Sequence, residues 1–162
     1  MRLEIEADIA AGTLYESPRL SPAGRDDYAQ LLLAATDNGT DDSLAAELRS
    51  SGRLNTQETA VRNGKSFAKK VPVTAPETLA EGEFNRYYAR AVCLRAINEG
   101  PGQVRVYRAK QVTAPRSESE LMIDRLFDAH ALLDDLRSSN GVEPALGLPP
   151  GPNSGLSVEL PT

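Results

Sequence analysis

The sequence holds few of the residues on which common binding and catalytic sites depend. Its 162 residues include one cysteine, Cys93, one histidine, His130, and no tryptophan. A single cysteine excludes an internal disulfide bond, and a single histidine excludes a metal site built from several histidines. No apolar run approaches the ~18 residues that cross a membrane, and the N-terminal residues lack the apolar stretch of a secretory signal peptide. We therefore expect no metal, no cofactor, no membrane partner and no export by a signal peptide.

Catalytic patterns are missing as well. His130 lies four residues before Asp134, a spacing that is typical of an ion pair on a helix, and a general base is the alternative interpretation. Cys93 lies among apolar neighbours inside a predicted helix, where a free thiol behaves as a small hydrophobic group rather than as a nucleophile. We expect no catalytic residue and no enzymatic activity. An enzyme of an unrecognised class, using His130, Asp134 or Arg90, stays open as a rival.

The charge of the chain is segregated along the sequence. Residues 1–48 carry 3 basic and 10 acidic side chains, residues 49–116 carry 13 and 5, and residues 117–162 carry 2 and 8. The three segments therefore have net charges of −7, +8 and −6. Two interpretations fit this pattern: the acidic ends pair with the basic middle of the same chain, or the basic middle faces an acidic partner or nucleic acid.

The length and the hydrophobic content of 40% fit one domain with a modest core. We expect a mainly helical α+β domain over residues 1–143, with a central amphipathic helix, a short sheet and extended N- and C-terminal segments. In the first part of the chain we expect a short helix or strand near residues 3–10, a helix that Ser21 caps and Asn38-Gly39 ends, and a short helix that Asp41 or Asp42 caps. A basic loop or hairpin over residues 51–73, around Asn63-Gly64, should follow. The rest of the domain should hold a core helix over 74–99, a strand over 103–110 and a helical part over 117–139.

The core helix over residues 74–99 has the strongest signal. Thr74-Ala75-Pro76-Glu77 fits a capping box at its start, and Gly100-Pro101-Gly102 ends it. Its large apolar residues recur at offsets of mainly three and four, so we expect them to form the core: Leu79, Phe84, Tyr87, Tyr88, Ala91, Val92 and Leu94. Glu83, Arg86 and Arg90 share the other face, a pattern that favours a solvated surface with ion pairs along the helix.

The basic residues also support a second interpretation, in which they bind a partner. Arginine forks suit carboxylates and phosphates, and the arginines of the core helix and of the following strand form the predicted partner-binding patch: Arg86, Arg90, Arg105 and Arg108. Four cations of the basic loop are candidate contacts for nucleic-acid phosphates: Arg62, Lys65, Lys69 and Lys70. No helix-turn-helix, zinc-finger or RNA-binding motif accompanies them, so base-specific recognition has no support.

Residues 144–162 differ in character from the rest of the chain. Prolines and glycines recur through them, so this segment cannot continue a helix and buries little on itself. Residues 156–160 alternate between apolar and polar in the manner of a short strand. We expect an extended arm, separate from the domain, whose strand adds to the sheet edge of a neighbouring subunit. Its apolar residues Leu156, Val158 and Leu160 are the predicted partner contacts.

Three strings of the sequence stand out as specific: LAEGEFNRYY (79–88), VYRAK (106–110) with PRSESE (115–120), and ALGLPPGPNSGL (145–156). They resemble small proteins of prophages and tailed bacteriophages. The resemblance covers about residues 70–162. It implies a phage origin and a virion component, and it transfers no catalytic residue.

Together these observations predict a structural or assembly protein of a bacteriophage-like particle, found in the virion or the host cytoplasm. We expect it to be a capsid-associated, connector or tail component. It would form a homo-oligomer and contact copies of itself and other virion proteins through the arginine patch and the arm. The alternative is a nucleic-acid-binding phage accessory protein that uses the basic segment 49–116.

Overall fold

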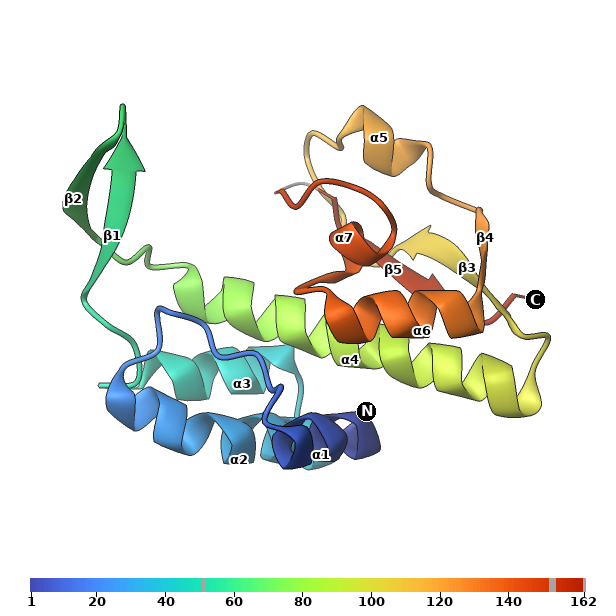
Figure 1. Ribbon diagram of the computed structural model, residues 1–162, viewed down its shortest axis with the longest axis horizontal. Helices are drawn as coiled ribbons and strands as arrows, with labels where there is room; N and C mark the ends of the chain where they lie inside the picture. Colours follow the sequence, from blue (N-terminus) through green and yellow to red (C-terminus); the bar gives the residue numbers. More distant parts are fainter. Residues whose placement is uncertain (51, 152–153, 162) are drawn as a thin grey trace. The chain divides into compact units, whose positions relative to one another are not determined.

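A computed structural model describes residues 1–50, 52–151 and 154–161 (Figure 1). Ser51 of the predicted basic loop, and Pro152, Asn153 and Thr162 of the predicted arm, lie outside the described residues. The described chain is about 50% helical, with 17% in strands. The prediction of a mainly helical α+β protein is therefore confirmed.

The elements of the described chain divide into helices and two small antiparallel sheets. The helices are α1 (Arg2–Ala11), α2 (Pro22–Asn38), α3 (Asp41–Arg49), α4 (Ala75–Glu99), α5 (Ser117–Glu120), α6 (Ala129–Ser138) and α7 (Val142–Ala145). The strands are β1 (Gln57–Arg62), β2 (Lys65–Lys70), β3 (Gln103–Arg108), β4 (Leu126–Asp128) and β5 (Leu156–Glu159). Strands β1 and β2 form a hairpin, and the other sheet has the order β4-β3-β5. Among the described helices, none combines the length and the hydrophobicity needed to cross a lipid bilayer.

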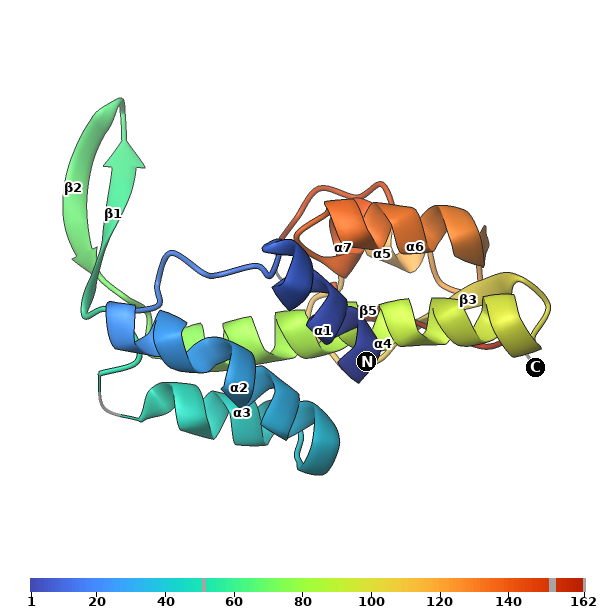
Figure 2. The same ribbon diagram turned by 60° about the horizontal axis from the view of Figure 1, so that its bottom comes forward.

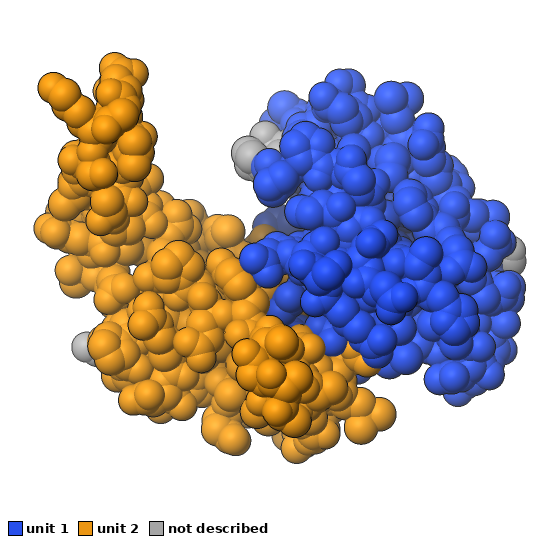
Figure 3. Space-filling model, viewed as in Figure 1, with its two compact units in different colours: residues 1, 85–162 blue, residues 2–84 orange. Residues whose placement is uncertain are grey.

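The chain forms two compact units, which Figure 3 shows in different colours. One unit comprises residues 2–84, and the other comprises residues 85–162 together with Met1. The division falls inside α4 rather than at the predicted boundary between residues 143 and 144. Residues 144–162 therefore belong to a compact unit, and the prediction of a separate arm is wrong.

In the unit of residues 2–84, local signals place the helices as expected. The Ser21 side chain accepts a hydrogen bond from the backbone N–H of Gly24 at 3.0 Å, with Pro22 in the first turn of α2. The cap of α3 differs from the prediction, because Thr40 rather than Asp41 or Asp42 is the N-cap. Thr40 and Ser43 exchange side-chain to backbone hydrogen bonds of 2.9 and 3.2 Å. The two aspartates lie in the first turn, where carboxylates stabilise the helix dipole.

The core of this unit lies among its first three helices. Its largest fully buried side chains are Ile5, Leu20, Tyr28, Leu32, Leu44 and Leu48. Gly24 is needed where α2 meets the chain that leads to the hairpin, because a Cβ atom at this position would lie 2.0 Å from the carbonyl oxygen of Arg53. This close approach fixes the start of the hairpin segment against α2.

In the unit of residues 85–162, β3 is the central strand of its sheet. Val104 and Val106 of β3 are fully buried, and so are Leu156 and Val158 of β5. The buried face of α6 contributes Leu132, Leu133 and Leu136 to the same apolar cluster. Figures 1 and 2 show α6, α7 and the β4-β3-β5 sheet close together in this unit.

The predicted helical part over 117–139 is interrupted. After α5 the chain turns at Asp124, whose φ of +65° lies in the left-handed region, and then forms β4. The backbone N–H of Asp124 donates to the carbonyl of Val106 at 2.9 Å, and the N–H of Val106 donates to the carbonyl of Arg125 at 2.9 Å. These bonds to β3 replace the helical bonds that the apolar spacing of Leu121, Ile123 and Leu126 predicted.

Candidate functional site

The β1–β2 hairpin is a highly exposed element of the described chain. It projects from its own unit in Figures 1, 2 and 3, and every residue of β2 is exposed. Asn63 and Gly64 connect the strands with φ values of +51° and +72°. A two-residue Asn-Gly turn with both φ angles positive is the connection that best matches the twist of an antiparallel hairpin. The prediction of a loop or hairpin around these two residues is confirmed, as a hairpin.

The base of the hairpin is tied to the segment that precedes α2. The backbone N–H of Asn55 donates to the carbonyl of Arg19 at 2.8 Å, and the Asn55 side-chain amide donates to the carbonyl of Leu20 at 3.1 Å. Leu20 and Leu54 also form an isolated antiparallel bridge. The N–H of Val71 donates to the carbonyl of Thr56 at 3.1 Å and closes the base. The hairpin is thus held firmly at its base while its strands extend into solvent.

The register of the strands divides the side chains between two faces. Cross-strand partners share a face, since side chains alternate along each strand. The face that we call the Phe67 face holds Glu58, Ala60 and Arg62 opposite Lys69, Phe67 and Lys65. The face that we call the Val61 face holds Gln57, Thr59 and Val61 opposite Lys70, Ala68 and Ser66. Three of the four cations predicted to contact nucleic acid therefore share a face, and Lys70 lies on the other.

Both faces expose a large apolar side chain. Phe67 is 46% exposed and Val61 is 69% exposed. Arg62, Asn63, Lys65 and Phe67 line an open pocket of about 410 Å³ at the tip of the hairpin. The tip thus combines a cationic rim with an aromatic ring, an arrangement that suits an acidic partner with an apolar or planar group.

Glu58 partly neutralises the Phe67 face. Its carboxylate accepts a hydrogen bond from the Arg19 guanidinium at 2.6 Å and lies 3.0 Å from the Lys69 ammonium. The hydrogen bond from Arg19, followed by that from Lys69, holds the pKa of Glu58 below its ordinary value. The charge of Lys69 is therefore matched within the chain, and Arg62 and Lys65 supply the uncompensated charge of this face.

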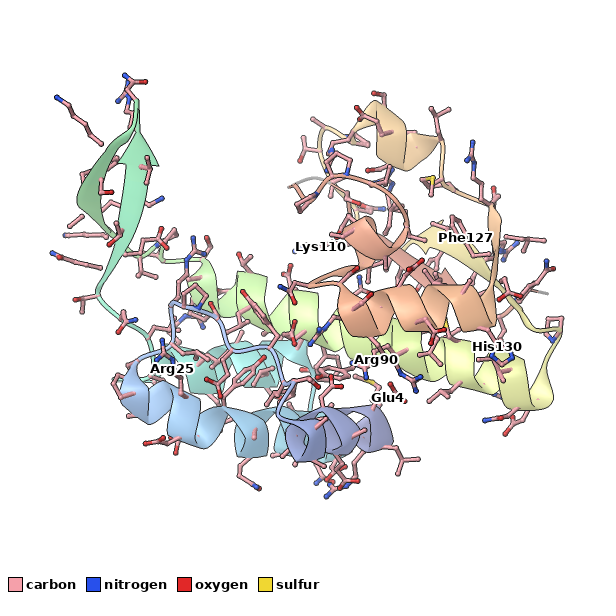
Figure 4. The ribbon with its side chains drawn as sticks, viewed as in Figure 1. Glu4, Arg25, Arg90, Lys110, Phe127 and His130 are labelled. Carbon is pink, nitrogen blue, oxygen red and sulfur yellow. The ribbon has the colours of Figure 1, made fainter. Side chains whose placement is uncertain are left out.

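The arginines of α4 that we predicted to face a partner are buried instead. Arg86 is 2% exposed and Arg90 is 1% exposed, and Glu83 on the same face is 5% exposed. Each guanidinium carbon lies 4.9 Å from the centroid of the Tyr87 ring, and Arg86 also donates to the carbonyl of Ser139 at 3.3 Å. Figure 4 labels Arg90 on α4. Both predictions for this face, a solvated surface and a partner patch, are wrong.

The apolar stripe predicted for the core is confirmed in part. Tyr87 is fully buried, and Val92 and Leu94 pack partly buried against the core, whereas Tyr88 is 38% exposed. The helix has turned its Glu83–Arg86–Arg90 face inward, because stacking on Tyr87 and the carbonyl of Ser139 give the guanidinium groups partners that do not depend on water. The boundaries of the helix and part of its apolar stripe were predictable from the sequence, but the burial of Arg86 and Arg90 was not.

The two arginines of the predicted patch that lie on β3 are engaged by acidic residues of the same unit. Arg105 bonds to Glu159 at 2.6 Å, since the β3–β5 register places these residues directly opposite each other. Arg108 bonds to Glu120 at 2.6 Å and donates to the carbonyl of Ser154. These contacts bear out the interpretation in which acidic segments pair with the basic middle of the same chain. Elsewhere, Arg53 pairs with Asp27 and Glu47.

The predicted contacts of the C-terminal segment are also internal. β5 pairs with β3 of its own chain, and Leu156 and Val158 are fully buried in the core of that unit. Leu160 packs partly buried against the same core. The side-chain amide of Asn85 donates to the carbonyl of Leu156 at 2.8 Å. These residues are therefore unavailable as a tether to another subunit.

The remaining candidates from the sequence occupy unremarkable positions. Cys93 is fully buried, as expected of a small hydrophobic residue, and burial raises the pKa of its thiol to about 12. His130 lies on the exposed side of α6 (Figure 4). Its ion pair with Asp134 stays a prediction, while a carboxylate oxygen of Asp134 lies 3.9 Å from Arg137. No group of three or more metal-ligating side chains is assembled within the described residues.

Sequence reasoning missed the two exposed apolar residues of the hairpin, Val61 and Phe67. A usable signal was present, because a two-residue turn at Asn63-Gly64 sets the register and so places Phe67 with Arg62 and Lys65. Comparisons of the chain with protein-family models, curated proteins and solved structures found no match. The functional interpretation of the hairpin therefore rests on its own geometry.

Proposed function

We propose that this protein is a structural or assembly protein of a bacteriophage-like particle, and that the β1–β2 hairpin makes its subunit contacts. The observation that carries the proposal is the exposure of a two-stranded hairpin on both faces. Strand pairs of this kind are marginally stable in water unless further strands or another layer join them. A partner that adds strands to the hairpin or covers it would supply that support.

The apolar residues of the hairpin support a contact with protein. Val61 and Phe67 lie on opposite faces, so a partner on either side would remove a large apolar side chain from water. Full burial of such a side chain contributes roughly 1.5–3 kcal/mol. Scattered single apolar residues on a surface carry no such argument, but here they cluster on one projecting element.

The phage setting rests on the resemblance of residues 79–88, 106–110, 115–120 and 145–156 to small proteins of prophages and tailed phages. The contact element differs from the one that the sequence predicted, since the arginine patch and the arm are internal. The hairpin replaces them as the surface for copies of the chain and for other virion proteins.

Sedimentation velocity over a concentration series tests this proposal. We expect the wild type to form oligomers at concentrations on the order of 100 µM, the range of weak, transient contacts. The double variant Val61→Ser/Phe67→Ser should stay monomeric at the same concentrations. Leu121→Ser is the matched control, because Leu121 is 68% exposed but lies outside the hairpin. A monomeric wild type, or equal losses in both variants, would contradict the proposal.

A nucleic-acid-binding accessory protein is the second candidate. It is favoured by the Phe67 face, where Arg62, Lys65 and Lys69 surround an aromatic ring, since cations hold the phosphates and rings stack on bases in single-strand sites. If this function is correct, the wild type should bind a single-stranded oligonucleotide with an affinity that falls linearly against salt in a log–log plot. Arg62→Ala/Lys65→Ala should weaken binding and reduce the slope, whereas Arg95→Ala on α4 should change neither.

A further inference from the structure

The two strands of the hairpin each present a row of backbone groups to solvent. In an antiparallel ladder, hydrogen-bonded pairs of residues alternate with pairs that are not hydrogen-bonded. The N–H of Val71 donates to the carbonyl of Thr56, so these two residues form a hydrogen-bonded pair, and every second pair from there is also hydrogen-bonded. In β1 the inward-bonded residues are Glu58, Ala60 and Arg62. The N–H and C=O groups of Gln57, Thr59 and Val61 therefore point away from β2, and Thr59 and Val61 are exposed. Edges of this kind are templates for pairing with another chain.

The edge of β1 is complementary to itself. Two antiparallel copies of β1, related by a two-fold axis at Ala60, bring Thr59 of each copy opposite Val61 of the other. The outward backbone groups then face each other, as a hydrogen-bonded ladder requires. On the Phe67 face, the same register places Glu58 of each copy opposite Arg62 of the other. Only a two-fold axis at Ala60 pairs Glu58 with Arg62 in this way, because residue 60 lies midway between residues 58 and 62.

The side chains of this register are compatible. Thr59 and Val61 are both β-branched, a type that packs well across strands, and Arg62 of the other copy would join Arg19 and Lys69 around the Glu58 carboxylate. The Ala60 side chains meet on the axis in a non-hydrogen-bonded pair, where Cα atoms approach to ~4.5 Å and small side chains fit best. The contact would join two hairpins into one four-stranded sheet.

The outer edge of β2 lacks this complementarity. Its charged residues are Lys65, Lys69 and Lys70, so a two-fold pairing of β2 would gather six ammonium groups without one carboxylate between the strands. The β1 edge can pair with itself without placing like charges directly opposite each other, because its register sets Glu58 opposite Arg62 and leaves the other paired residues uncharged.

We infer that the β1 edge is a homodimer contact, in which two copies pair antiparallel about Ala60. This inference rests on the proposed function, because it names the partner and the mode of the subunit contact. The contact is small, one six-residue strand from each copy, and belongs with weak, transient interfaces. Such a contact suits a particle in which it recurs many times.

Two proline variants test the edge. Thr59 and Ala68 lie directly opposite each other in the hairpin, and both direct their N–H groups outward, so proline at either position spares the β1–β2 ladder. We expect Thr59→Pro to raise the dimer dissociation constant by at least about tenfold in sedimentation equilibrium, because proline removes a donor and its ring obstructs the β1 edge. Ala68→Pro should leave the constant unchanged.

A cysteine pair tests the register. Ala60→Cys would place one thiol from each copy beside the two-fold axis. The Cα atoms of the two cysteines would then lie within the ~4.4–6.8 Å that a disulfide bond needs. Under mild oxidation it should form a covalent dimer at least about tenfold faster than Ala68→Cys. The native Cys93 is fully buried and does not compete.

The outcomes separate this inference from the proposed function. If the wild type and both proline variants associate equally, and the two cysteine variants cross-link at equal rates, the subunit contact does not use the β1 edge. The inference is then overturned, and the proposed function still rests on the Val61→Ser/Phe67→Ser experiment. If Ala68→Pro dissociates the dimer instead, the contact uses β2 and the inference is overturned. If dimers form only with added oligonucleotide, the partner of the hairpin is nucleic acid and the inference is overturned. If the wild type stays monomeric and Ala60→Cys does not cross-link, both proposals are overturned.

Discussion

The protein has two basic regions that look alike in the sequence and differ in the structure. In the unit of residues 85–162, the four arginines of the predicted patch are buried or engaged by residues of the same unit. In the hairpin, Arg62, Lys65 and Lys70 are exposed. The difference follows from topology: the β3–β5 register places Glu159 directly opposite Arg105, whereas the hairpin extends away from the helices of its own unit (Figure 1). Local charge alone therefore does not identify a binding surface.

A new carboxylate placed in each region should have very different effects on stability. Val158→Asp would bury a carboxylate in the core beside β3, and we expect it to lower the free energy of unfolding by about 4 kcal/mol or to prevent folding of that unit. Val61→Asp, at 69% exposure, should change it by less than about 0.5 kcal/mol. Urea denaturation followed by circular dichroism measures both. Equal effects would mean that β5 is not part of the core.

Removal of one arginine from each region gives the next largest difference. Arg90→Ala deletes a side chain that is 1% exposed and stacked on Tyr87, and we expect a loss of about 2–4 kcal/mol in the free energy of unfolding. Arg62→Ala should cost less than about 0.5 kcal/mol. The same denaturation experiment tests the pair. A tolerated Arg90→Ala would indicate that the guanidinium is not needed inside this unit.

A smaller effect is expected for the ion pair that joins β3 to β5. Both Arg105 and Glu159 are about one third exposed, at 32% and 34% of their side chains, so solvent screens their interaction. We expect a coupling of about 0.5–1 kcal/mol in a double-mutant cycle of Arg105→Ala and Glu159→Ala. A coupling of zero would mean that the backbone pairing of β5, and not this ion pair, holds the strand.

The smallest effect is a pH dependence at the base of the hairpin. Because Arg19 and Lys69 lower the pKa of Glu58 in the folded state, the carboxylate stabilises the fold above its unfolded pKa. That stabilisation is lost as the pH falls through the lower, folded pKa. We expect Glu58→Gln to melt below the wild type at pH 7, with a difference that shrinks once the pH falls below about 4. Differential scanning calorimetry at pH 7 and below pH 4 measures the melting temperatures of both proteins. An equal difference in melting temperature at the two pH values would show that the protonation of Glu58 is not linked to folding.

The parts of the fold that the sequence predicts are those that depend on neighbours in the chain. Ser21-Pro22 starts α2 and Asn63-Gly64 turns the hairpin, and in both cases the deciding hydrogen bonds and φ angles lie within a few residues. The helix α4 has the bounds expected of it to within one residue, since a stop of Gly100-Pro101-Gly102 is also local.

The parts that the sequence does not predict depend on partners far along the chain. The strand β4 was predicted as helix because Leu126 and Phe127 continue a helical spacing from Leu121 and Ile123, while the strand that pairs with it lies about twenty residues earlier. The burial of Arg86 on α4 was missed for a similar reason, because one of its partners is the carbonyl of Ser139. In the candidate site, the cations and the turn were predictable, but the choice between surface and core was not.

The separation in sequence between paired strands sets an order of folding. The hairpin closes over two residues, whereas Arg105 and Glu159, which face each other across β3 and β5, are 54 positions apart. Local hairpins form in microseconds, and pairings of long separation form later. The open edge of β1 is thus exposed to other nascent chains before the second sheet is complete. An open strand edge of this kind is a site for intermolecular pairing, and we expect it to make the protein prone to aggregate at high rates of synthesis.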